Sequence, residues 1–328
     1  MKIIEPQVEL WKQEPTLEGA WHQIARATRV CYQSKPREGE SSEDFVKRII
    51  LKPALIEGNL DDLEHCKFNF DKMHGGMLEH GTVYITVPPY IADDKISAKA
   101  FTILIINKYS KVNTFNNWDY ITTNLRVLFE ENILDCLKYI TEPTEHHFKR
   151  YTFSVITDIG VTREMNRHRT FSIAEQSTRY CDLTRNRFGD CLNFPIPNWI
   201  NENLLETSEV DNCLLSDMSN DLNSATTEYI NNFDIKESNG TDNWDDIDFY
   251  IYANIVAQYC YKALRNKGWR PEQARQVLPL GLKTQAVYTA FDNDWQHFIK
   301  LRADNVSGKV HPNMKIIADK IKELFNNK

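Results

Sequence analysis

The densest group of residues able to bind a charged ligand lies between positions 167 and 180. Its polar members are Arg167, His168, Arg169, Glu175, Gln176, Ser177 and Arg179. Arginine binds phosphate and carboxylate through planar, bidentate hydrogen bonds, and the chain as a whole has a net charge of -7. A cluster of arginines in an acidic chain predicts a pocket for a polyanionic ligand, most simply one or more phosphorylated nucleotides. The alternative is an exposed, solvated helix start without a function.

A second group lies in the C-terminal third. Arg275 belongs to the segment Arg-Pro-Glu-Gln-Ala-Arg-Gln-Val-Leu-Pro at 270–279, and Arg302 belongs to Leu-Arg-Ala-Asp at 301–304. On a helix, Arg302 shares a face with Trp295 and Phe298, which points it inward. A buried arginine needs an anionic or multi-acceptor partner. Both a ligand and an internal ion pair with an Asp or Glu meet that need.

These segments resemble the signature of the flavin-dependent thymidylate synthases (ThyX). Arg-His-Arg is followed by Ser177 and Arg179-Tyr180 at the family's spacing, and the two C-terminal segments follow in the family's order. Upstream, His-Gly-Gly-Met-Leu-Glu-His at 74–80 resembles the family's H-x-x-x-x-E-H. Arg-Ala-Thr-Arg-Val-Cys-Tyr at 26–32 resembles its N-terminal segment.

The resemblance implies an enzyme that methylates dUMP to dTMP. Methylenetetrahydrofolate would donate the carbon, and FAD reduced by NADPH would supply the hydride. The implied fold is α+β, a central sheet flanked by helices. It would form one catalytic domain over 1–328, assembled as a homotetramer whose active sites are shared between subunits. Two other interpretations stay open: a non-catalytic nucleotide-binding homologue and a flavoprotein that oxidises NADPH without methyl transfer.

The resemblance also assigns roles to residues. Arg302 is the catalytic candidate, contacting the uracil and stabilising charge that develops on its ring. The residues implied to bind or border the flavin are His74, Gly76, Glu79, Arg167, His168, Arg169, Glu175, Asn293 and His297. Those implied to bind dUMP are Arg163, Glu164, Glu175, Gln176, Ser177, Arg179, Arg275 and Arg302. The three residues of Arg-His-Arg are expected to act as cationic donors to phosphate.

Four positions depart from the family pattern. Ala174 replaces an Asn, and Cys31 stands where Ser is common. Glu164 replaces a Gln, where a carboxylate would weaken binding of an anionic nucleotide or pair with Arg163. His297 replaces what is often an Asn, and is either a flavin hydrogen-bonding group or a core histidine. Ala174 and Glu164 motivate the non-catalytic interpretation.

Composition narrows the remaining classes of function. The 328 residues include seven cysteines, an odd number without a C-x-x-C pair, so neither a disulfide framework nor a metal site is expected. No G-x-G-x-x-G follows a strand and no P-loop motif is present, so the FAD and NADPH are not expected on a Rossmann fold. The acidic balance argues against nucleic-acid binding. No apolar run approaches the ~20 residues of a membrane span, and no signal-peptide core is apparent, so a cytoplasmic protein is expected.

Periodicity and breaker residues predict the elements that position these groups. Strands are expected at 82–87 and 151–157. Helices are expected at 17–31, 42–57 (with a break at Pro53), 121–139, 159–169, 248–267, from Pro271, and from a cap at Asp292 or Asn293 through Arg302. The helix at 159–169 would carry Arg-His-Arg at its C-terminal end. Residues 88–150 and 201–247 are expected to be insertions, the second of them acidic.

Overall fold

The computed structural model describes residues 2–88, 95–185, 191–200, 246–306 and 308–328. The predicted acidic insertion at 201–247 therefore lies almost entirely outside the described residues. Contacts divide the chain into two compact units. Unit 1 comprises residues 1–6, 158–160 and 178–283, and unit 2 comprises residues 7–157, 161–177 and 284–328.

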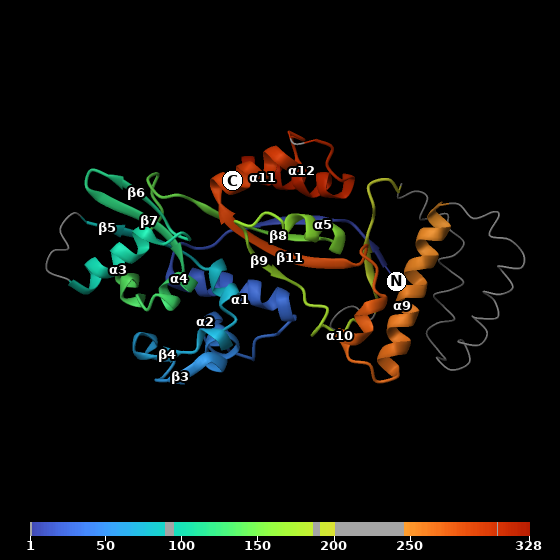
Figure 1. The fold of residues 1–328 in the computed structure, drawn as a ribbon, viewed down its shortest axis with the longest axis horizontal. Coiled ribbons are helices and arrows are strands. Elements are labelled where there is room, and N and C mark those ends of the chain that lie inside the picture. Colours follow the sequence, from blue (N-terminus) through green and yellow to red (C-terminus); the bar gives the residue numbers. More distant parts are fainter. Residues whose placement is uncertain (1, 89–94, 186–190, 201–245, 307) are drawn as a thin grey trace, which may run out of the picture. The chain divides into compact units, whose positions relative to one another are not determined.

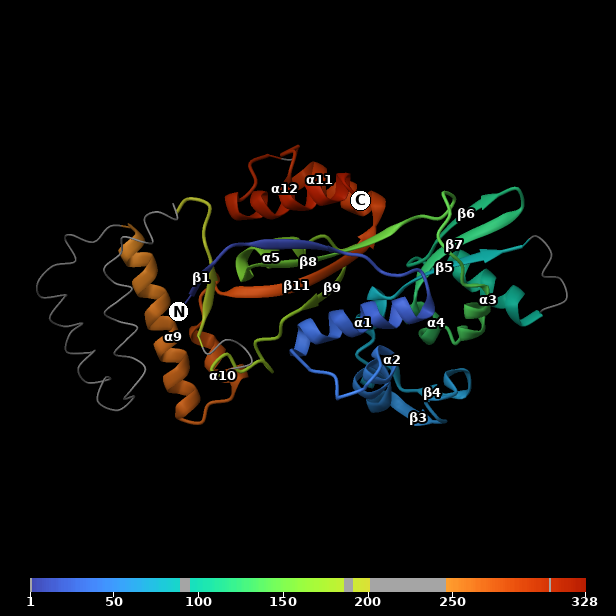
Figure 2. The ribbon, with the colours of Figure 1, turned by 180° about the vertical axis from the view of Figure 1, so that it is seen from behind.

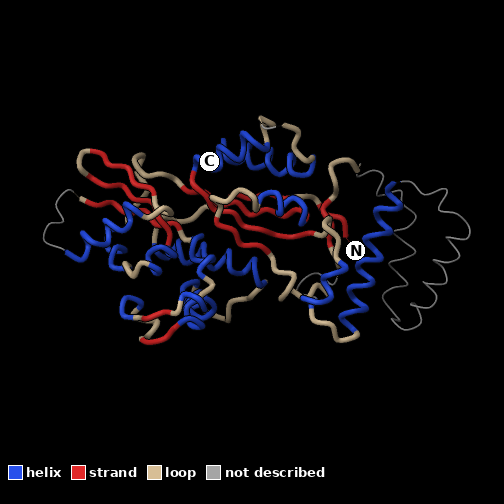
Figure 3. The backbone as a smooth tube through the Cα atoms, viewed as in Figure 1, coloured by secondary structure: helices blue, strands red, loops and turns tan. Residues whose placement is uncertain are grey.

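Both helices and strands occur along the chain (Figure 3), so the predicted mixture of the two is confirmed. The strands are β1 (Lys2–Ile4), β2 (Gln7–Trp11), β3 (Leu55–Glu57), β4 (Lys67–Phe68), β5 (Thr82–Val87), β6 (Lys111–Phe115), β7 (Trp118–Asn124), β8 (Arg150–Asp158), β9 (Ser172–Glu175), β10 (Asn193–Pro195) and β11 (Lys283–Phe291). The α-helices are α1 (Leu17–Tyr32), α2 (Ser42–Val46), α3 (Lys95–Ile106), α4 (Leu125–Glu130), α5 (Ile159–Met165), α9 (Asp246–Asn266), α10 (Pro271–Ala274), α11 (Asp292–Arg302) and α12 (Pro312–Asn326). None of the helices in the described ranges is both long and apolar enough to cross a bilayer.

The central sheet of unit 2 has the order β2-β8-β11-β9, with β2 antiparallel to β8 and β9 antiparallel to β11. Side chains on a strand alternate between faces, and β11 shows the consequence. Ala286, Tyr288 and Ala290 pack in a cluster with α11 and α12, whereas Val287 packs in another with α1 residues. The sheet is therefore covered by α11 and α12 on one face and by α1 on the other (Figures 1 and 2).

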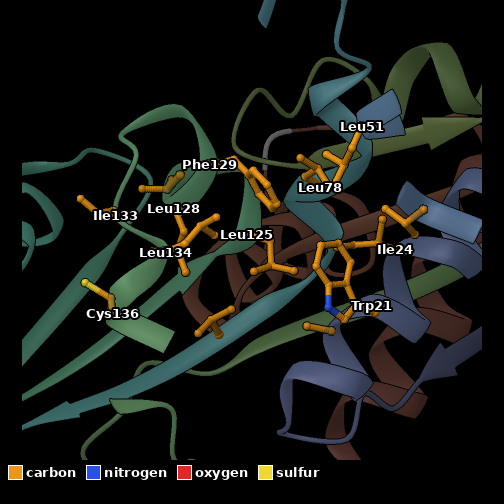
Figure 4. Close-up of a cluster of buried hydrophobic side chains, with 14 of the residues drawn as sticks. Trp21, Ile24, Leu51, Leu78, Leu125, Leu128, Phe129, Ile133, Leu134 and Cys136 are labelled. Atoms are coloured by element: carbon orange, nitrogen blue, oxygen red, sulfur yellow. The ribbon is translucent and has the colours of Figure 1, made fainter. Parts of the chain in front are cut away.

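A second sheet of unit 2 has the order β5-β7-β6, all antiparallel. It shares a hydrophobic cluster with α1, α2 and α4, in which Trp21, Leu78, Leu125 and Phe129 interlock (Figure 4). Thr16 caps α1 by accepting a hydrogen bond from the Gly19 amide at 3.0 Å. The cap and the buried stripe explain why 17–31 was predictable.

Unit 1 contains the parallel pair β1–β10 and the long helix α9. Ile251 and Ile255 of α9 pack against Phe194 and Leu282. Helix α9 ends before Gly268, whose φ of 90° lies in the left-handed region that favours glycine. The predicted helix at 248–267 is thus confirmed.

Several predicted boundaries were wrong. Residues 121–124 belong to β7, because they pair with β5, and only the following residues are helical. The helix predicted at 42–57 is a regular α-helix only over α2. A π-helical turn at 47–51 and a 3-10 turn at 52–54, which contains Pro53, follow it. The chain then forms β3 at 55–57. Helix α11 has Phe291 rather than Asp292 or Asn293 at its N-cap.

Candidate functional site

Arg-His-Arg lies in a turn after α5, not at the end of a helix. Helix α5 stops at Met165, and the amide of His168 donates to the Met165 carbonyl at 2.9 Å. The Phe171 amide then donates to the His168 carbonyl at 3.1 Å, which closes the turn. Met165 and Phe171 are buried on either side. The turn therefore has a fixed base and an exposed outer surface.

Three arginines on this part of unit 2 have no acidic partner among the described residues. Arg163, Arg167 and Arg169 are all exposed. Within the described part of the chain, no carboxylate lies within 4.0 Å of any of them. Three uncompensated guanidinium groups so close in sequence favour an anionic ligand.

His168 differs from its neighbours because its ring is half-buried against aromatic side chains. It stacks on Phe171 with centroids 5.7 Å apart and meets the edge of Phe298 at 5.0 Å. Burial, together with the positive charge of Arg302, lowers the pKa of His168 to about 4. The expectation that His168 is a cationic donor to phosphate was therefore wrong: at neutral pH this imidazole is uncharged.

Arg302 points inward from the last turn of α11, as its helical face predicts. Its Nε donates to Nε2 of His168 at 3.3 Å, and its Nη1 lies 3.6 Å from the Glu164 carboxylate. The Arg302 side chain is 23 % exposed. An internal ion pair, one of the two alternatives open from the sequence, is thus present, and it uses Glu164. The remaining exposed part of the guanidinium is available to a ligand.

The Glu175 carboxylate already accepts three hydrogen bonds within unit 2. The donors are the hydroxyls of Thr162 (2.7 Å) and Thr284 (3.1 Å) and the side-chain amide of Asn166 (3.2 Å). Thr162 belongs to α5 and Thr284 to β11. Glu175 therefore ties α5 to the central sheet, a role that the sequence did not suggest.

The backbone after β9 is held at two consecutive residues. The Gln176 amide donates to the Gln285 carbonyl at 2.8 Å, and the Ser177 amide donates to the Cys31 carbonyl at 2.9 Å. Cys31 lies near the end of α1, so the N-terminal segment of the signature contacts the central one. The replacement of Ser by Cys31 leaves this contact unchanged because only its carbonyl oxygen takes part.

Ala174 has a packing explanation. Its side chain is 1 % exposed and lies in the cluster of Trp11, Ala27, Val30 and Val287 between the sheet and α1. An asparagine there would place an amide among apolar groups, which is unfavourable without hydrogen-bonding partners.

Arg179 and Arg275 belong to unit 1, so their placement is described within that unit only. Arg179 lies 3.8 Å from the Glu272 carboxylate. Arg275 donates to the Thr178 hydroxyl at 3.2 Å. The sequence grouped both with Ser177 as dUMP ligands, and that grouping stays a prediction.

The 74–80 segment forms a short 3-10 helix from Gly75 to His80 rather than a simple turn. His74 is exposed and lies 3.4 Å from the Tyr32 hydroxyl. The Glu79 carboxylate accepts from Arg126 at 2.5 Å. A side chain at Gly76 would meet no atom within 4 Å, so packing does not explain this glycine.

Asn293 and His297 both lie exposed on α11. The alternative that His297 is a core residue was therefore wrong. The Asn293 side chain accepts a hydrogen bond from Nζ of Lys111. Lys111 and Arg150 were missed from the sequence, where neither stands in a motif. No cluster of three or more His, Cys, Asp or Glu suited to a metal occurs among the described residues.

Comparison with known proteins identifies the family. The family model Thy1, described as thymidylate synthase complementing protein, matches residues 117–328, more than half of the chain. The chain belongs to this family. The segments at 26–32 and 74–80 lie outside the matched region.

Three curated relatives are similar at lower coverage. The flavin-dependent thymidylate synthase of Thermosipho melanesiensis is 28% identical over 193 residues, which are 57% of this chain and 66% of the relative. A probable flavin-dependent thymidylate synthase of Paramecium bursaria Chlorella virus 1 is 28% identical over 174 residues, which are 53% of this chain and 65% of the relative. The flavin-dependent thymidylate synthase of Thermosipho africanus is 29% identical over 168 residues, which are 50% of this chain and 58% of the relative. In each case the match spans less than two thirds of the relative's length.

A solved structure of the UMP/dUMP methylase PolB from Streptomyces cacaoi, bound with 5-Br dUMP, is also similar to this Thy1 family member. It is 16% identical and has a TM-score of 0.37, with 100% of this chain and 93% of that chain covered. Likeness at this level supports no conclusion.

Proposed function

We propose that this Thy1 family member is a flavin-dependent thymidylate synthase. It would convert dUMP to dTMP with methylenetetrahydrofolate as carbon donor and NADPH-reduced FAD as hydride source. We further propose a ThyX-like fold, a single catalytic domain with insertions at about 88–150 and 201–247, and a homotetramer with shared active sites. The family match carries the proposal, and the curated relatives are named for the same reaction.

The donor set of unit 2 suits a cofactor with phosphate groups. Arg167 and Arg169 are exposed cations without a carboxylate partner in the described ranges, and they stand on a turn whose base is buried. Phosphate is bound by guanidinium through paired charge-assisted hydrogen bonds. We assign these two residues to FAD, which when bound would carry the reducing equivalents from NADPH.

The protein's own contribution would be positioning and electrostatics. Arg302 is oriented on two sides, by the neutral imidazole of His168 and by the Glu164 carboxylate. A guanidinium held in this way needs little reorganisation to stabilise negative charge as it develops on a uracil ring. Gln176 and Ser177 stand on backbone fixed at both residues, which suits selective binding of a nucleotide base.

The deciding experiment measures dTMP by chromatography after FAD-loaded protein is given dUMP, NADPH and methylenetetrahydrofolate, with each component omitted in turn. Product that requires every component is expected. Arg302→Ala should lower the rate by about 10²–10³, the effect typical of a removed oxyanion donor, while FAD stays bound. Unchanged dTMP formation in Arg302→Ala would contradict the proposed role.

The Glu164–Arg302 ion pair favours one other function. The Glu164 carboxylate lies 3.6 Å from Arg302, the catalytic candidate, and partly neutralises its positive charge. Such neutralisation suits a protein that binds nucleotide without turnover. Bound FAD and dUMP with no dTMP would support this second function and count against the first.

A further inference from the structure

Two adjoining cavities in unit 2 are lined by several cationic side chains. One, of about 390 Å³, lies beside β2 and the start of β8, and its charged lining residues are Lys12, Lys149, Arg150 and Lys328. No Asp or Glu of the described residues lines it. The other, of about 760 Å³, shares Lys149, Tyr151 and Lys328 with the first, and its further lining residues include Lys111, Asn293 and two acidic residues, Glu145 and Asp292. These two cavities together form what we call the lysine groove.

Arg150 is the most deeply placed cation of the groove. Among the described residues, its guanidinium donates only to neutral oxygens, those of the Glu79 carbonyl (3.0 Å), the Thr82 hydroxyl (3.2 Å) and the Ser172 hydroxyl (3.3 Å). Its Nε is buried and has no hydrogen-bond partner. Burial lowers the pKa of Arg150 to about 10. Such desolvation of a cation is unfavourable unless an anion compensates for it.

Lys111 and Lys149 likewise donate to neutral groups rather than to carboxylates of the described residues. Nζ of Lys149 donates to the Thr144 carbonyl, and Nζ of Lys111 donates to Asn293 and lies 4.3 Å from the Phe291 ring. Burial lowers the pKa of both ammonium groups. In the described residues, no carboxylate comes within 4.0 Å of either one.

The two acidic residues that line the larger cavity form their ion pairs with side chains other than Lys111, Lys149 and Arg150. Asp292 forms an ion pair with Lys328 at 2.7 Å. Glu145 is 85 % exposed and lies beside His146 at 3.7 Å. Lys111, Lys149 and Arg150, which form no ion pair within 4.0 Å in the described residues, therefore remain as an anion-binding set.

The shape and lining narrow the class of anion. Cations on separate strands, β6 and the start of β8, suit a ligand with more than one charged group. The rings of Tyr84 and Tyr151 line the groove and offer apolar surface to a planar group. Each cavity has a volume of the size that holds a small ligand or cofactor.

We propose that the lysine groove binds the phosphate groups of a dinucleotide, either FAD or NADPH. The choice of these two ligands rests on the proposed function, whereas the anion site itself rests on the groove. The assignment gives the predicted insertion at 88–150 a role, because Lys111 on β6 reaches Asn293 on α11.

The test compares the variants Lys149→Gln, Lys149→Arg and Lys111→Gln with the wild-type protein. The affinity for FAD is measured by flavin fluorescence, and the KM for NADPH is measured on FAD-loaded protein. Lys300→Gln, an exposed change of the same charge on α11 outside the groove, is the control. Thermal unfolding of each variant shows that the fold is intact.

A loss of affinity of about tenfold is expected for each Gln variant, the effect of one charge-assisted contact with phosphate, with Lys149→Arg closer to wild type. Weakened FAD binding would assign the groove to FAD. A raised KM for NADPH with FAD binding intact would assign it to NADPH. Unchanged values for both ligands would overturn the inference, even where dTMP is formed. Failure of dTMP formation with both ligands bound normally in wild type would instead count against the proposed function.

Discussion

The Nε of Arg302 donates a hydrogen bond to Nε2 of His168 across 3.3 Å, and so joins the last turn of α11 to the Arg-His-Arg turn. The acceptor role requires that His168 carry its proton on Nδ1 and stay uncharged. Its lowered pKa, about 4, keeps the imidazole uncharged at neutral pH. His168 is thus a positioning residue for Arg302.

Replacing His168 separates its packing from its hydrogen bond. His168→Phe keeps an aromatic ring against Phe171 and Phe298 but removes the acceptor, so kcat for dTMP should fall about tenfold, the typical effect of one lost orienting contact. His168→Gln can still accept from Arg302 and should recover part of the rate. Steady-state kinetics with FAD content measured in parallel check this. Equal rates for the Phe variant and wild type would remove the positioning role.

Glu164→Gln restores the residue common in the family. It removes a negative charge 3.6 Å from Arg302, so dUMP should bind several-fold more tightly. Isothermal titration with dUMP measures the change, and Glu131→Gln, an exposed carboxylate on another surface, is the control. Weaker binding in Glu164→Gln would mean that the ion pair orients Arg302 more than it repels the nucleotide.

Arg167→Gln and Arg169→Gln test the exposed surface of the turn. Each should weaken the binding of FAD about tenfold, and more at low salt, because a charge-assisted contact to phosphate is lost. The midpoint of thermal unfolding should not move, since both side chains are exposed. Arg37→Gln, an exposed arginine outside the signature, is the matched control, and a loss in it as large as in the other two would point to a general charge effect.

His80 makes the stability of the fold depend on pH. This fully buried imidazole contacts the Thr289 hydroxyl at 2.8 Å, and burial lowers its pKa from 6.5 to about 3. The unfolded chain therefore binds a proton that the folded chain does not, so stability is complete above pH 6.5 and falls as the pH drops toward 3. At pH 5 the loss from this residue should be about 2 kcal/mol.

Urea unfolding at pH 7 and pH 5 measures that loss. His80→Gln should reduce the dependence by the share of His80 and leave the remainder, since the lowered pKa of His168 acts in the same direction. If the His80 variant lost stability as steeply as wild type, another group would have to be responsible.

Glu175 supports the architecture through three accepted hydrogen bonds. Glu175→Ala leaves the Thr162, Asn166 and Thr284 donors without their partner, and should lower the free energy of unfolding by about 2–3 kcal/mol. Chemical denaturation checks this. A Glu175→Ala protein as stable as wild type, but unable to bind dUMP or FAD, would show that the carboxylate is primarily a ligand.

The sequence predicted correctly those helices and strands whose structure is determined by their own residues and immediate neighbours. The strand at 82–87 is rich in β-branched and aromatic residues and is bounded by Gly81 and two prolines, and it appears as predicted. The helix at 17–31 combines a cap with an apolar stripe. Neither needs knowledge of distant residues.

The predictions were wrong where contacts with residues distant in the sequence determine the local structure. The helical pattern of 121–139 begins in β7 because Ile121 pairs with Ile85 on a neighbouring strand. After α5, the side chain of Asn166 is engaged by Glu175 and Tyr288, so the chain leaves the helix before Arg167. The contact between Arg302 and Glu164 joins residues far apart in sequence, and spacing alone could not select that partner.

The region matched by the family model begins at residue 117, yet two of its structural supports come from before that point. Strand β2 pairs along β8, and the Cys31 carbonyl holds the amide of Ser177. A chain shortened to 117–328 would leave β8 as an open sheet edge, prone to aggregation, and would release the serine of the signature. The boundary of the family match and the boundary of the folded unit thus differ in this protein.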